Sequence, residues 1–325
     1  MSILIKKPGI LTTIQDLGRI GFRRLGINPG GVMDRTAARL INILLGNDEN
    51  EAVVEMHFPA AEMVFEKNAV FAIGGADFSA ELDGEPIANW QPYFVEKGSV
   101  LRFTKKISGN RAYLAVSGGF KVEKWLGNSS TNLATKIGGK DGRPLAAGDQ
   151  IQFALKIKAR PKIRQCHISS SLIPYYRPFP TVRVIVGAEF PRLSKSSQGL
   201  LFVHDFVVSP NSNRMGFRLK GEPVELAQPF ELLSSAASFG TIQLLPDGQL
   251  IVLMADHQTS GGYPRIGHVI TRDLPLIAQL GPGDKVAFHL IEIDEAEALA
   301  AEFERELNFY RIGCKFQANS WQQST

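Results

Sequence analysis

The sequence is poor in the residues that several classes of protein depend on. Only two cysteines occur among the 325 residues, Cys166 and Cys314, too few for a disulfide framework or a thiolate metal site. No uninterrupted apolar run reaches the ~18 residues that a membrane-spanning helix needs. The N-terminal segment from Met1 to Lys7 is too short for a signal peptide, and its basic residues are in the wrong place. We therefore expect a cytoplasmic protein that does not bind a membrane.

Several common catalytic motifs are also missing. The sequence has no Gly-x-Ser-x-Gly nucleophile elbow, no Gly-Lys-Ser/Thr phosphate loop and no dinucleotide fingerprint. No two histidines have metal-ligand spacing, so we expect no metal site. The glycine-rich stretch Ile137–Gly142 is a weak phosphate candidate and is better interpreted as a loop. The motifs considered so far therefore do not identify a reaction.

The net charge of +4 is modest, but basic residues concentrate between positions 155 and 195, where Glu189 is the single acid. Such a stretch can bind nucleic acid or an acidic partner. No recognition helix, zinc-finger spacing or aromatic stacking motif accompanies it. A solvated basic linker is the better interpretation, and we expect no nucleic-acid binding.

What the sequence does have is turns and short apolar runs. Its 31 glycines and 18 prolines favour a mainly β protein with a few short helices. The predicted strands include Ala52–Met56, Glu62–Phe65, Val70–Ile73, Phe78–Leu82, Tyr93–Val95, Val100–Phe103, Ala112–Val116, Gln150–Ala154, Val182–Val186 and Leu250–Leu253. Apolar residues spaced three and four apart predict one helix over Met33–Gly46, and a second begins at Asp294 and runs through Leu307.

The length suggests about two domains. We expect a first domain over residues 1–158, a basic linker over 159–180 and a second domain over 181–309 that includes the last helix. A polar tail is predicted for residues 310–325.

An internal repeat relates the two halves. The stretch Arg19–Gly26 matches Arg214–Gly221, and Asp83-Gly84 corresponds to Asp247-Gly248. Further on, Tyr113–Phe120 parallels Leu253–Tyr263, and Gly148–Phe153 parallels Gly283–Phe288. Four correspondences in the same order indicate two similar β-rich halves. A cleft between such halves is a natural position for a ligand.

The most conspicuous polar stretch is Met254–Pro264, which follows the apolar run Leu250–Leu253. Asp256 can act as a general base or orient a substrate amide, or it can simply cap its own turn. Arg19 and Arg214 suit a carboxylate or phosphate ligand. Asp34 lies where it can instead be a helix N-cap. Backbone N–H groups at Gly118 and Gly262 can bind an oxyanion or only turn the chain. A polar cleft suited to a small amide- or carboxyl-bearing ligand is the prediction.

Longer motifs resemble one family. They are Thr13-Ile-Gln-Asp-Leu-Gly-Arg19, Met33-Asp34, Tyr113-Leu-Ala-Val-Ser-Gly-Gly119, Asn213-Arg-Met-Gly216, Gly240-Thr-Ile-Gln243 and Asp256-His-Gln-Thr-Ser-Gly-Gly-Tyr-Pro264. The chain resembles the family variously called allophanate hydrolase subunit 2, the KipA-like proteins, or the C subunit of ATP-dependent 5-oxoprolinase. It also looks like part of the carboxyltransferase domain of urea carboxylase. The resemblance implies two cyclophilin-like β-barrel domains.

It further implies an enzyme component that works with a companion (the B subunit, or subunit 1) on a small amide or ureido substrate. The first expectation is an oxoprolinase subunit, which opens 5-oxoproline to glutamate with ATP used by the complex. The alternatives are a biotin-dependent carboxyltransferase, with biotin carried by a partner, and a regulatory KipA-like binding protein. We expect no cofactor bound by this chain alone. Two stretches, Asn128-Ser-Ser-Thr131 and Gly187-Ala-Glu189, depart from the pattern of many relatives, and these departures bear on the substrate rather than on the fold.

The residues expected at the site fall into two groups. Asp256 and Arg214 are the candidate catalytic residues, as the acid/base or orienting carboxylate and as the carboxyl anchor. The candidate substrate-binding residues are Arg19, Asp34, Ser117, Gly118, Gln258, Thr259, Gly262 and Tyr263.

Overall fold

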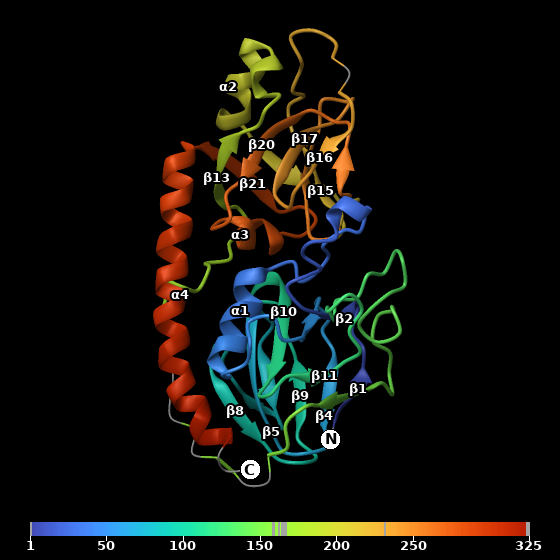
Figure 1. Ribbon diagram of the computed structural model, residues 1–325, viewed down its shortest axis with the longest axis vertical. Helices are drawn as coiled ribbons and strands as arrows, with labels where there is room; N and C mark the ends of the chain where they lie inside the picture. The colour runs from blue at the N-terminus through green and yellow to red at the C-terminus, as the bar shows by residue number, and fades with distance from the viewer. Residues whose placement is uncertain (1, 158–159, 162, 164–167, 231, 323–325) are drawn as a thin grey trace. The chain divides into compact units, whose positions relative to one another are not determined.

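The structure is a computed structural model that describes residues 2–157, 160–161, 163, 168–230 and 232–322 (Figure 1). The chain divides into two compact units. Unit 1 comprises Met1–Arg19, Asp34–Pro174 and Glu304–Thr325, and unit 2 comprises Ile20–Met33 and Tyr175–Phe303. The basic linker expected at 159–180 falls partly on residues 159, 162 and 164–167, which lie outside the described residues.

Unit 1 contains two antiparallel sheets. The first has the strand order β11-β12-β1-β4-β9-β6-β7, with bounds β1 (Ser2–Lys7), β4 (Glu62–Phe65), β6 (Ala80–Leu82), β7 (Glu85–Pro86), β9 (Val100–Phe103), β11 (Phe120–Lys121) and β12 (Gln150–Phe153). The second has the order β2-β3-β10-β5-β8, with bounds β2 (Thr12–Gln15), β3 (Val53–Met56), β5 (Ala69–Asp77), β8 (Pro92–Val95) and β10 (Ser108–Val116). Apolar side chains of both sheets form one core, in which the rings of Phe65 and Phe71 lie 5.1 Å apart.

Helix α1 (Arg35–Leu44) packs on β5 and β10 of the second sheet (Figure 1). Its start is fixed by Asp34, whose Oδ1 accepts a hydrogen bond of 2.9 Å from the Ala37 amide. Gly74 on β5 makes the close approach possible, because a Cβ there would lie 2.5 Å from Cγ2 of Ile41. The helix predicted from the spacing of apolar residues is confirmed.

Unit 2 is built on a closed barrel in the order β13-β20-β17-β18-β15-β14-β21. Its strands are β13 (Thr181–Val186), β14 (Asp205–Val208), β15 (Gly216–Lys220), β17 (Thr241–Leu244), β18 (Leu250–Leu253), β20 (Arg265–Val269) and β21 (Lys285–Leu290). The strands β13 and β21 pair in parallel, and the other pairs are antiparallel. Alternate residues fill the interior: Phe217 and Leu219 of β15 are buried, whereas Arg218 and Lys220 are exposed.

Short elements complete unit 2. They are the 3₁₀ helices η1 (Arg23–Leu25) and η2 (Phe190–Arg192), the helices α2 (Lys195–Val203) and α3 (Leu274–Ala278), and a two-stranded ribbon of β16 (Ser235–Ala236) and β19 (Ser260–Gly261). We call this pair of strands the β16–β19 ribbon. Together the two units confirm a mainly β protein with few helices.

The last helix, α4 (Ile293–Gln322), is longer than predicted. It continues through most of the segment 310–325, where the sequence predicts a polar tail. Leu307 and Cys314 lie on one buried face of it, seven residues apart. Glu304 pairs with Arg39, and Arg311 pairs with Glu49. These distant partners stabilise a segment whose own apolar periodicity is weak.

Two of the stretches that the sequence analysis paired share a local hydrogen bond. Asp149 and Asp284 each follow a glycine and precede a strand, and each accepts a hydrogen bond from the amide three residues before it, at 2.7 and 2.8 Å. By contrast, the residues after Arg214 form strand β15, whereas those after Arg19 lead into η1 within unit 2. The correspondence of these two arginines therefore does not extend to the segments that follow them.

No helix in the described part of the chain is long and apolar enough to cross a membrane. Within those same residues, no group of three or more His, Cys, Asp and Glu side chains is arranged to hold a metal ion.

Candidate functional site

The two residues expected to be catalytic are paired with each other. Arg214 Nε donates to Asp256 Oδ2 at 2.8 Å, and Arg214 Nη2 donates to Asp256 Oδ1 at 3.2 Å. The guanidinium is nearly buried, with 9% of the side chain exposed, against 12% for Asp256. A two-bond pair of this kind fixes both planar groups in one orientation. Asp256 therefore orients Arg214, and Arg214 orients Asp256.

Three backbone segments hold this ion pair. Arg214 lies in a tight turn in which Asn213 N–H donates to the Gly216 carbonyl, and the Asp256 amide donates to the Arg214 carbonyl at 2.8 Å. The segment before Met33 makes two further hydrogen bonds to the pair. Arg214 Nη2 donates to the Gly31 carbonyl, and Asn28 Nδ2 donates to the Asp256 carbonyl at 3.1 Å. Neither Asn28 nor Gly31 was expected at the site; Gly31 contributes only its backbone carbonyl, which leaves no signal in a sequence.

The loop after Asp256 carries the other expected residues of unit 2. The amide of Ala237 donates to the Thr259 carbonyl at 3.1 Å, which ties the loop to the segment after β16. Gly262 and Tyr263 line a cavity of about 800 Å³ together with residues of the β17–β18 turn and the segment around Phe230. Tyr263 is 43% exposed, so its ring can contact a ligand in this cavity.

A polar layer of residues that were not among the expected site residues lies on the outer face of the barrel. Arg265 pairs with Glu189 through Nε at 3.0 Å and Nη2 at 2.9 Å, and the pairing, led by the side-chain hydrogen bond, lowers the pKa of the Glu189 carboxyl. Beside it, Nδ1 of His268 lies 3.2 Å from Thr241 Oγ1. Burial, and then the charge of Arg265, lower the pKa of His268, which is therefore neutral at pH 7. In the sequence, this layer is indicated by the alternation of Thr241 and Gln243 with apolar residues on β17.

In unit 1, Arg19 belongs to a buried network around the Asn128–Thr131 loop. Its Nη2 donates to the Ser130 carbonyl, and its guanidinium lies 5.1 Å from the centroid of the Trp125 ring. Asp16 accepts hydrogen bonds from Ser130 Oγ at 2.5 Å and from the Ser129 amide at 2.6 Å. With 2% of Arg19 exposed, this network stabilises the loop.

The remaining expected residues of unit 1 occupy two other places. Asp34 is fully buried at the start of α1, where its side chain caps the helix and its amide donates to the Tyr113 hydroxyl at 2.9 Å. Gly118 follows β10 with φ +80°, and its amide donates to Asn47 Oδ1 at 2.8 Å. The Gly118 N–H is thus bound within the protein. Ser117 buries an Oγ that has no hydrogen-bond partner among the described residues.

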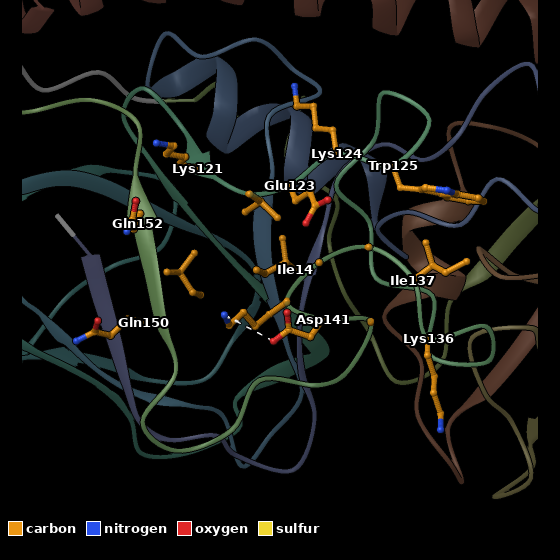
Figure 2. Close-up of a pocket in the computed structure, with 16 residues that line it drawn as sticks. Ile14, Lys121, Glu123, Lys124, Trp125, Lys136, Ile137, Asp141, Gln150 and Gln152 are labelled. Atoms are coloured by element: carbon orange, nitrogen blue, oxygen red, sulfur yellow. Dashed lines mark ion pairs between the residues drawn. The ribbon is translucent and has the colours of Figure 1, made fainter.

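Unit 1 also contains an open pocket of about 580 Å³ beside this network (Figure 2). Its lining includes the glycine-rich stretch 137–142 and Trp125, and Figure 2 shows Lys121, Lys124 and Lys136 among the side chains around it. Lys140 pairs with Asp141 at 3.6 Å, drawn as a dashed line in Figure 2. Several lysine side chains line the pocket, but none of the expected site residues does.

This barrel unit with a buried arginine–aspartate pair, joined to a second β-rich unit, has clear relatives. The family model "Carboxyltransferase domain, subdomain A and B" matches residues 25–290. The chain belongs to this carboxyltransferase-domain family.

Particular relatives refine that assignment. The chain is 38% identical to the C subunit of 5-oxoprolinase from Haemophilus influenzae, over 92% of this chain and 94% of that protein. It is 34% identical to the C subunit of 5-oxoprolinase from Escherichia coli, over 95% of this chain and 96% of that protein. The solved structure of K. lactis urea amidolyase matches 95% of this chain and 20% of its own with a TM-score of 0.88 at 26% identity. The chain is thus a homologue of enzyme components, as the sequence motifs predicted.

Proposed function

We propose that this chain is the C subunit of an ATP-dependent 5-oxoprolinase complex, which hydrolyses the ring amide of 5-oxoproline to give L-glutamate. The observation that carries the proposal is the extent of the match to two 5-oxoprolinase C subunits, 94% and 96% of their own lengths. The match to urea amidolyase, in contrast, covers 20% of that protein. A companion of the B-subunit kind completes the complex, in the cytoplasm. ATP is used by the complex, and this chain by itself binds no cofactor.

We place the substrate-binding surface in unit 2, around the Arg214–Asp256 pair and the loop that carries Gln258, Thr259, Gly262 and Tyr263. Both carboxylate oxygens of Asp256 accept hydrogen bonds from Arg214. This supports an orienting role for Asp256 rather than a role as the proton acceptor. Arg214, held in place, supplies positive charge for the substrate carboxylate. In unit 1, Ser117 is retained as a candidate contact, because its buried hydroxyl has no partner among the described residues. The contacts of Arg19, Asp34 and Gly118 are those of structural residues.

For the fold, we propose that both units derive from a cyclophilin-like barrel and arose by duplication, with the closed barrel kept in unit 2 and the strands of unit 1 divided between two sheets. The matching hydrogen bonds of Asp149 and Asp284 support a common origin.

The test is to purify the tagged protein with its companions from its native cells. Release of glutamate from 5-oxoproline is then assayed with and without ATP, with Asp256→Asn in parallel. ATP-dependent release is the expected result. If the intact complex releases no glutamate, the proposal fails.

Carboxyl transfer is the second candidate function, because the matching family is described as a carboxyltransferase domain. It requires biotin on a partner protein. A biotinylated protein detected by avidin in the same preparation, combined with no release of glutamate, would favour it. Absence of both would favour the regulatory, KipA-like alternative.

A further inference from the structure

Two buried glutamines occupy the same position in a repeated Thr-Ile-Gln sequence, residues 13–15 on β2 and 241–243 on β17. Gln15 is fully buried, and its Nε2 donates to Thr13 Oγ1 and to the Thr131 carbonyl, both at 3.1 Å, while its Oε1 has no partner among the described residues. Gln243 is also buried, at 1% exposure, yet neither its Nε2 nor its Oε1 has a hydrogen-bond partner among the described residues. The amide nitrogen of Gln15 is therefore bound within the protein, whereas neither the nitrogen nor the oxygen of the Gln243 carboxamide is bound to another described residue.

The Gln243 carboxamide lies outside the barrel core. Its neighbours Ile242 and Leu244 belong to the apolar core of unit 2, so the alternation of the strand directs Gln243 to the opposite face. There it lies beneath Gly261 of the β16–β19 ribbon: a Cβ on Gly261 would be 3.0 Å from Gln243 Nε2 and 3.3 Å from Gln258 Nε2. Gln243 thus adjoins the loop that follows Asp256.

The ribbon above it contains a second unused polar group. Ser235 pairs with Gly261, and its buried Oγ likewise has no partner within the described part of the chain. A buried polar group without a partner is destabilising, and an apolar side chain of the same shape would remove that penalty. Two such groups in one small region indicate a ligand that satisfies them.

The chemistry of a carboxamide defines the ligand. It presents an N–H donor and a carbonyl acceptor side by side. A cis amide presents the complementary pair, because its N–H and its C=O point to the same side, and the ring of a lactam enforces this geometry. A carboxylate offers acceptors only, and a trans amide directs its donor and acceptor apart.

We propose that Gln243 recognises the cis amide of the substrate through two parallel hydrogen bonds, with the β16–β19 ribbon moving aside to admit it. The proposal rests on the proposed function for the identity of the ligand, since 5-oxoproline is a cis lactam. Gln243 would then be the residue that distinguishes the closed ring from glutamate, the ring-opened product.

The test uses the purified complex with two matched variants, Gln243→Met and Gln15→Met. Paired hydrogen bonds from a carboxamide to a base edge discriminate by about 1–3 kcal/mol, which is roughly 5- to 150-fold. We therefore expect Gln243→Met to lower kcat/KM for 5-oxoproline by at least ~5-fold while leaving the melting temperature unchanged or higher. Gln15→Met should lower the melting temperature, because the variant loses two hydrogen bonds that the protein uses.

A substrate analogue adds a readout that a structural role would not change. N-methyl-5-oxoproline lacks the ring N–H, so wild type should bind it at least ~5-fold more weakly than 5-oxoproline, and Gln243→Met should not discriminate between the two. The inference is overturned if Gln243→Met keeps the wild-type kcat/KM, or if its melting temperature falls as that of Gln15→Met does.

Failure of the proposed function gives a different result. If the wild-type complex does not act on 5-oxoproline, that function is refuted, and the same variants are titrated with urea, which also places N–H beside C=O. Weaker binding of urea by Gln243→Met than by wild type would then support the inference, and equal binding would refute it.

Discussion

Replacing Asp256 by asparagine tests the ion pair at the centre of the candidate site. The substitution keeps the shape of the side chain but removes the charge that faces Arg214, whose guanidinium is nearly buried. Removing one partner of a buried pair commonly destabilises a protein by about 3–5 kcal/mol. Asparagine still offers one acceptor, and the Gly31 carbonyl stays bound to Arg214. We therefore expect a loss of about 2–3 kcal/mol in the free energy of unfolding of unit 2.

Hydrogen exchange can localise this loss, because unit 1 serves as an internal control. The slowest amides of the unit 2 barrel, such as those of β15 and β18, report the opening of that unit. A loss of 2–3 kcal/mol corresponds to exchange that is about 30- to 150-fold faster there. Exchange in β5 and β10 of unit 1 should not change.

A double-mutant cycle with Arg214→Gln separates the pair from its surroundings. If the two side chains act as one unit, the loss in the double variant is smaller than the sum of the two single losses by about 1–3 kcal/mol. Activity should follow the same pattern, with Asp256→Asn and the double variant equally impaired. Additive effects, or a change below about 0.5 kcal/mol in Asp256→Asn, would refute the structural role assigned to the pair.

Two further predictions concern unit 1. Hydrogen bonds from Lys6 and then Lys7 lower the pKa of Glu62 from 4.5 to about 2, so its stabilising effect is present above pH ~4.5 and is lost as the pH falls toward 2. Urea unfolding across this range should show that Glu62→Gln removes that pH dependence. The change in the free energy of unfolding should be about 1 kcal/mol, because the lysines are exposed. An unchanged pH profile in the variant would contradict the pairing. In a thermal unfolding assay, Gly74→Ala should destabilise the protein by about 1–3 kcal/mol, because the new Cβ would overlap Ile41. The control is Gly199→Ala in α2 of unit 2, where a new Cβ meets nothing within 4 Å. This variant should be neutral or stabilising in the same assay.

The strands of this protein could be predicted from two patterns: β3 and β5 are buried on both faces and contain apolar runs, whereas burial alternates along others. In β15, the apolar residues Phe217 and Leu219 alternate with charged ones, and the same period marks β21. The full length of α4 could not be predicted, because it depends on ion pairs such as Glu304 with Arg39, which is 265 residues away in the sequence.

The candidate site shows the same division between local pattern and long-range register. Arg214 and Asp256 were each expected from local motifs, but their pairing depends on strand register. Gly216 of β15 lies opposite Leu253 of β18, so the residues just before one and just after the other must meet. Once that register is known, the ion pair follows from the sequence.

Gln243 was not predicted as a site residue, because the pattern of its own strand indicates a solvent-exposed side chain. A polar residue that alternates with Ile242 and Leu244 on a barrel strand is expected to face solvent. In this protein the β16–β19 ribbon covers that face, and its four residues, Ser235, Ala236, Ser260 and Gly261, carry no strand signal. The ribbon therefore buries a carboxamide that the strand pattern predicts to be solvated. Because water is no longer a partner, this carboxamide is selective for a ligand that offers both a hydrogen-bond donor and an acceptor. Ligand recognition on the outside of a barrel therefore depends on the elements whose sequences are least informative.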